Sequence, residues 1–150
     1  MKLALMLHVF GVVVWVGGMF FAYLALRPAA ARLLEPPQRL PLWAATLGRF
    51  FVWVWICVAL VLGSGFYMFA VIADLGKVPA YTHIMLYVGI AMALIFTYVF
   101  AAPFAALKHA VAARDWKEGA RALNHIRMAV ALNLGLGLAN IVIATAGAML

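Results

Sequence analysis

An uncharged apolar run near the N-terminus, Leu3 to Leu26, constrains the fold of this chain more than any other feature. As a helix the run would be about 36 Å long at ~1.5 Å per residue, which exceeds the ~30 Å hydrocarbon core of a bilayer. The run therefore predicts a helix that crosses a membrane. His8 lies inside it, where an imidazole finds no water, so His8 is a candidate functional residue. The alternative is a histidine near the interface that bonds a backbone carbonyl or a lipid headgroup.

Three further uncharged runs are long enough to cross a bilayer: 50–73, 78–107 and 128–150. Only 10% of the 150 residues are charged and 69% are hydrophobic, whereas a soluble domain has ~25% charged residues. We therefore predict a single all-α domain, an antiparallel up-and-down four-helix bundle that is an integral, multi-pass protein of the lipid bilayer. The predicted spans are about 3–26, 50–73, 78–104 and 128–149.

The basic residues predict the orientation of this bundle. Nine of them lie in the two connections that follow the first and third spans, and only Lys2 and Lys77 lie on the opposite side. Because cytoplasmic connections carry the excess of Lys and Arg, we expect both termini outside, in a bacterial-type inner membrane. The net charge of +7 then needs no nucleic-acid partner. The nine residues are Arg27, Arg32, Arg39, Arg49, Lys108, Arg114, Lys117, Arg121 and Arg127.

The first span has one face of mostly small residues. His8, Gly11, Trp15, Gly18 and Ala22 recur at steps of three and four, so they share a side of the helix. Small residues let membrane helices approach closely, which predicts that this side faces the bundle. Trp15 lies too deep for an interfacial tryptophan, so we expect it to pack in the interior, against a helix or a cofactor.

The fourth span carries polar and small residues at steps of four, three and four: Asn133, Gly137, Asn140 and Ala144. Buried asparagines in lipid must form hydrogen bonds, and across helices these contribute about 1 kcal/mol each. We interpret the stripe as a link between helices, with a substrate contact as the alternative.

A pair of histidines on the first and third spans suggests a cofactor. These spans run in the same direction, and His8 and His83 each lie about five residues into their span, so their depths match within a turn at ~1.5 Å per residue. Two imidazoles at one depth suit the two faces of one haem iron. Gly11 would leave space for the ring, and Trp15 or Tyr87 could pack against its edge. We therefore predict b-type haem between helices 1 and 3 near the outer face, with a redox or electron-transfer role.

Copper is the alternative cofactor, bound or transported across the inner membrane. Met6 and Met85 are predicted at the same end as His8 and His83. Thioether with imidazole is a soft ligand set that favours Cu(I). Each methionine also has a simpler interpretation, because methionine fills gaps in membrane cores.

The sequence argues against hydrolytic chemistry. It has no P-loop, no GxGxxG, CxxC or HExxH motif, and its four acidic residues all lie outside the predicted spans. If the protein is an enzyme, a haem-dependent membrane oxidoreductase is the class that its side chains permit. A third possible role is that of a non-catalytic assembly subunit. The sequence also leaves open whether the protein forms a homo-oligomer or binds a redox partner. The acidic residues are Glu35, Asp74, Asp115 and Glu118.

The first span also resembles a known family. Leu7-His8, the stretch from Trp15 to Phe21 (WVGGMFF) and the following Arg27 are similar to the first helix of CopD-like membrane proteins, a superfamily that includes HemJ-type protoporphyrinogen oxidases. The resemblance implies a four-helix membrane bundle with His8 as the histidine of the first helix. It implies copper handling at the outer face for the CopD branch, and b-type haem and protoporphyrinogen oxidation for the HemJ branch.

One departure separates the chain from the HemJ branch. Proteins of that branch have a lysine early in the third helix, whereas this span is uncharged and has His83 and Met85 there. The departure weighs against the HemJ reaction and leaves haem binding open, with His83 as the second ligand.

The predicted topology can be tested with cysteine accessibility or reporter fusions in intact cells. Positions Met1, Gly76 and Leu150 are expected outside, and Pro36 and Trp116 inside, because of the asymmetry of the basic residues. A cytoplasmic N-terminus would contradict the prediction.

Overall fold

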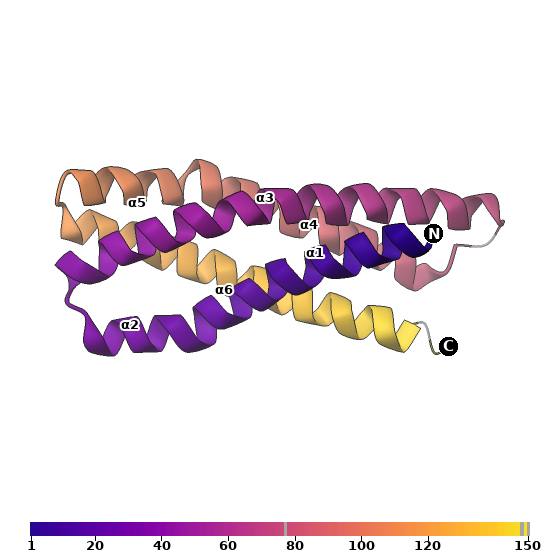
Figure 1. The fold of residues 1–150 in the computed structure, drawn as a ribbon, viewed down its shortest axis with the longest axis horizontal. Coiled ribbons are helices and arrows are strands. Elements are labelled where there is room, and N and C mark those ends of the chain that lie inside the picture. The colour runs from indigo at the N-terminus through magenta and orange to yellow at the C-terminus, as the bar shows by residue number, and fades with distance from the viewer. Residues whose placement is uncertain (77, 148, 150) are drawn as a thin grey trace.

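Four long helical rods lie side by side and alternate in direction (Figure 1). The computed structural model describes residues 1–76, 78–147 and 149. Within them the rods extend over Lys2–Leu33, Pro36–Asp74, Ala80–Ala112 and Trp116–Gly147, and each is long and apolar enough to cross a membrane. The prediction of an all-α membrane bundle with four spans is confirmed. The elements are α1 (Lys2–Phe21), η1 (Ala22–Leu26), α2 (Arg27–Leu33), α3 (Pro36–Asp74), α4 (Ala80–Ala101), α5 (Pro103–Ala112) and α6 (Trp116–Gly147).

The bundle has two different ends. Both chain termini and the connection from α3 to α4 lie at one end, which we call the terminal end (Figure 1). The connections from α2 to α3 and from α5 to α6 lie at the other, which we call the basic end because the nine basic residues named above cluster toward it. The antiparallel order predicted from the sequence is thus confirmed.

Two of the rods change course at a proline. Pro28 has no N–H, and its ring would clash with the carbonyl four residues earlier in a regular α-helix. The chain widens instead into the π-helical segment η1, where the Arg27 N–H donates to the Ala22 carbonyl. The third rod is bent at Ala102 (φ −111°, ψ −77°), directly before Pro103. The sequence predicted one unbroken span over 78–104, and Pro103 divides it into α4 and α5.

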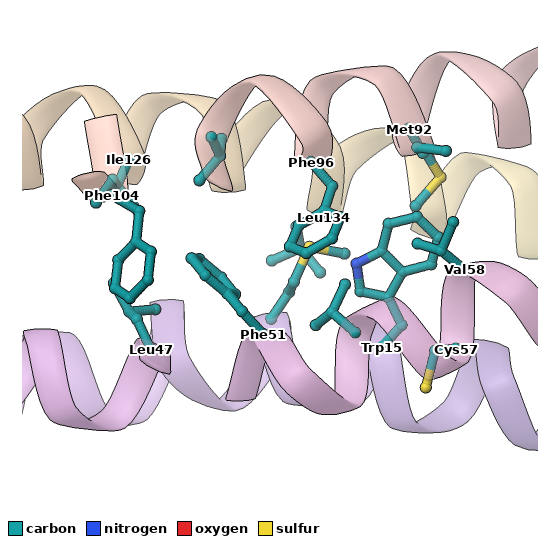
Figure 2. Close-up of a cluster of buried hydrophobic side chains, with 14 of the residues drawn as sticks. Trp15, Leu47, Phe51, Cys57, Val58, Met92, Phe96, Phe104, Ile126 and Leu134 are labelled. Carbon is teal, nitrogen blue, oxygen red and sulfur yellow. The ribbon is translucent and has the colours of Figure 1, made fainter. Parts of the chain in front are cut away.

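The helices pack around an aromatic core. α1 packs mainly on α3, and α4 and α5 pack on α6. Phe51 of α3 makes edge-to-face contacts with Phe96 and Phe104, with ring centroids 5.3 and 4.9 Å apart. Trp15 of α1 contacts the same Phe96 at 6.3 Å (Figure 2). Trp15 is 3% exposed, which confirms that it packs in the interior.

The small face of α1 allows the close approach to α3. A Cβ atom at Gly11 would lie 2.7 Å from Val61 Cγ2 and 3.3 Å from the Cys57 carbonyl oxygen. A Cβ atom at Gly18 would overlap the Phe50 ring. The prediction that this face is turned toward the bundle is therefore confirmed.

The outer surface of the rods is apolar, as lipid contact requires. Tyr87, Leu94 and Tyr98 on α4 are 67%, 66% and 58% exposed, and Val13 on α1 is 63% exposed. In a bilayer these side chains face lipid chains.

The close contact of α1 and α3 predicts a difference between two glycine variants. Gly11→Ala should be less stable than Gly17→Ala by about 1–3 kcal/mol, because the new methyl group overlaps Val61 at position 11 and meets nothing within 4 Å at position 17. The gain in helix propensity is the same in both variants and cancels. Unfolding in mild detergent measures the difference, and equal stabilities would contradict the packing described here.

Candidate functional site

His8 lies at the terminal end of the interface between α1 and α3. Its imidazole is half-buried, and its Nδ1 atom is 3.0 Å from the Ser64 hydroxyl oxygen. Gly65 makes room for the ring, since a Cβ atom there would lie 3.3 Å from His8 Cε1. The histidine of the first helix is therefore held by α3.

The contacts of the Ser64 hydroxyl favour one tautomer of His8. A serine hydroxyl has one proton to donate. Ser64 donates it to the Leu60 carbonyl one turn earlier in α3, with the Val61 carbonyl also within 3.4 Å. Toward His8 the hydroxyl oxygen is thus an acceptor, so we assign the proton of the neutral ring to Nδ1. The Nε2 atom is left with a free lone pair.

The Nε2 atom of His8 makes no hydrogen bond to another side chain among residues 1–76, 78–147 and 149. The Val61 backbone carbonyl is a second hydrogen-bond acceptor beside the ring. Histidines that bind metals usually donate their other ring N–H to a protein acceptor, which fixes the orientation of the ring. The contact of His8 Nδ1 with Ser64 has this form.

His83 has a comparable arrangement at the start of α4. Its Nδ1 atom is 3.4 Å from the Pro79 carbonyl oxygen, and because a carbonyl can only accept, this contact favours the neutral tautomer with the proton on Nδ1. The ring stands perpendicular to Phe69, with centroids 5.1 Å apart. Both histidines contact the segment 64–69 of α3, His8 from α1 and His83 from α4.

The other residues predicted for the site are more dispersed. Gly11 packs against Val61, and Trp15 lies deeper in the core against Phe96. Met6 is 60% exposed and Tyr87 67% exposed. Met85 is half-buried, and its carbonyl accepts a hydrogen bond of 3.3 Å from the Asn140 carboxamide.

The Asn140 bond links α6 to α4. It supports the interpretation of the polar stripe of the fourth span as a connection between helices. Asn133, the other asparagine of the stripe, is 3% exposed.

The sequence analysis singled out neither Ser64 nor Met68. Ser64 sits between two glycines in an apolar run, where a single hydroxyl gives little signal. The sequence nevertheless contained a clue. The second span runs antiparallel to the first, so a residue near the end of the second span must lie at the same depth as His8. Met68 lies one turn beyond Ser64 on the same side of α3, is half-buried, and is the only methionine of that helix.

The site has few classical metal ligands. The described residues contain no group of three or more His, Cys, Asp or Glu side chains close enough to hold one ion. A metal at the terminal end would therefore need methionine with histidine, a set that favours Cu(I) over Zn²⁺ or a hard cation.

The structure gives no support to haem b. The cavity in the core next to Trp15 measures about 30 Å³. Pockets for ligands of that class are roughly 300–1,000 Å³. This cavity is therefore too small for a macrocycle, and neither His8 nor His83 lines it.

The helices and their composition define an integral, multi-pass membrane protein of the four-helix class. The family model of copper resistance protein D (CopD) matches residues 44–147, more than half of the chain. The chain therefore belongs to the CopD family, and the family suggested by the sequence is confirmed. The match begins within α3 and leaves out His8. No curated protein and no solved structure matches the chain.

Proposed function

We propose that this protein binds Cu(I) at the terminal end of the bundle as part of copper handling in the membrane. The observation that carries the proposal is the free Nε2 lone pair of His8, which Ser64 orients through Nδ1. Membership of the copper resistance protein D family supports copper as the ion. The site itself supports a soft ion, because imidazole and thioether are its main donors.

The proposed ligands come from three helices. His8 Nε2 is the ligand of α1, and Met68 offers a thioether one turn beyond Ser64 on α3. His83 and Met85 at the start of α4 complete the set, since the contact of His83 Nδ1 with the Pro79 carbonyl favours the tautomer with a bare Nε2. Met6 is exposed on α1 two residues before His8, where it would receive the ion at the surface.

The terminal end is proposed to face the outside of a bacterial-type inner membrane. The excess of Lys and Arg at the basic end supports this orientation through the positive-inside rule. Copper would then enter the site from outside and meet His8 within the first two turns of α1.

The proposal predicts a specific order of Cu(I) affinities. Ser64→Ala should weaken binding about 10-fold, because loss of the acceptor at Nδ1 frees the ring to rotate and change tautomer. His8→Ala removes the ligand and should weaken binding further. Competition with a chromogenic Cu(I) chelator, on protein in mild detergent, measures both. His109→Ala, an exposed histidine at the basic end, is the control and should bind as the wild type does.

Three other results would contradict the copper proposal. If His8→Ala bound Cu(I) with the affinity of the wild type, the proposed copper site at His8 would be excluded. A Soret band in the purified protein that is lost in both His8→Ala and His83→Ala would favour haem b and a redox role. A non-catalytic assembly subunit would be favoured if the protein co-purified with a larger complex and if replacing either histidine left that association unchanged.

A further inference from the structure

A small cavity lies in the core, away from the terminal end. Its volume is about 30 Å³, and residues of all four rods line it. Nearly all of them are apolar, among them Trp15, Met19, Phe51 and Phe96. The exception is Asn133 of α6.

Asn133 brings an unpaired acceptor to this cavity. Its side chain is 97% buried, since only 3% of it is exposed, and its carboxamide oxygen Oδ1 has no hydrogen-bond partner. In the hydrocarbon region neither lipid nor bulk solvent can supply one. A buried polar group of this kind is costly unless something small and polar occupies the space beside it.

Trp15 brings a donor to the same cavity. None of the side-chain hydrogen bonds among residues 1–76, 78–147 and 149 uses its indole N–H. Figure 2 shows the indole nitrogen on the side of the ring that faces Phe51. Trp15 of α1 and Asn133 of α6 both line the cavity.

We propose that this cavity holds a single water molecule that bridges Trp15 and Asn133. The water oxygen accepts the indole N–H, and one water proton is donated to Asn133 Oδ1. The cavity exceeds the roughly 10–15 Å³ that one water molecule requires, and two polar partners are the minimum that buried waters have. An apolar occupant would leave both groups unpaired, and a cation would find one amide oxygen and one thioether, that of Met19.

The bridge would link α1 to α6 just before α1 changes course. Ala22, the first residue of η1, lines the same cavity. The water therefore holds the regular part of α1 against α6 at the point where the helix widens. This role is independent of copper binding at the terminal end.

The test is infrared difference spectroscopy of the protein in lipid films, hydrated either with ordinary water or with water labelled with heavy oxygen. The wild type should show the O–H stretch of an internal water, and heavy oxygen should shift the frequency of this band. The internal water should also exchange with deuterium oxide more slowly than the waters on the protein surface do. Asn133→Leu, which fills the space and removes the acceptor, should lose this band. The carboxamide oxygen of Asn140 is also buried without a partner, but Asn140 does not line the cavity, so Asn140→Leu is the matched control and should retain this band.

Trp15→Phe provides a second variant that keeps Asn133 in place. It removes only the donor, so the water band should shift or disappear while the helical content by circular dichroism stays unchanged. Absence of a protected water band in the wild type would overturn the proposal. Its persistence in both Asn133→Leu and Trp15→Phe would do the same. Asn133→Leu should bind Cu(I) as the wild type does, so the water proposal and the copper proposal can be tested independently.

Discussion

The hydrogen bond between His8 and Ser64 joins α1 to α3 at the terminal end of the bundle. The hydroxyl oxygen accepts from Nδ1 because its own proton is already donated to the Leu60 carbonyl. The ring can come this close because Gly65 has no side chain, and because Gly11 lets the two helices approach. Packing and hydrogen bonding thus act together, and the result is an imidazole whose second nitrogen is free at the terminal end.

Much of the fold could be predicted from the sequence, since a bilayer permits few alternatives to apolar helices. The four runs, their antiparallel order and the inward face of α1 follow from length and periodicity alone. The division of the third span at Pro103 was not predicted, although a proline disfavours helix at the residue before it. The site was harder to predict. Periodicity places His83 and Tyr87 on one face but does not tell whether a neighbouring helix or lipid covers it, and Tyr87 proves 67% exposed.

Two separate parts of the chain point to the same family. The resemblance of the first span depends on residues from Leu7 to Arg27, whereas the match to copper resistance protein D covers residues 44–147. His8 belongs to the first part, and Ser64, Met68 and His83 belong to the second. The candidate site lies where the two parts meet, so the proposed role of His8 depends on the α1–α3 contact as well as on the family.

The most direct test of this account is the tautomer of His8, measured by solid-state NMR on protein with isotope-labelled imidazole nitrogens in lipid and without copper. The account predicts a neutral ring with the proton on Nδ1 and a bare Nε2, and a change of this pattern in Ser64→Ala. A proton on Nε2 in the wild type, or a spectrum that Ser64→Ala leaves unchanged, would contradict it.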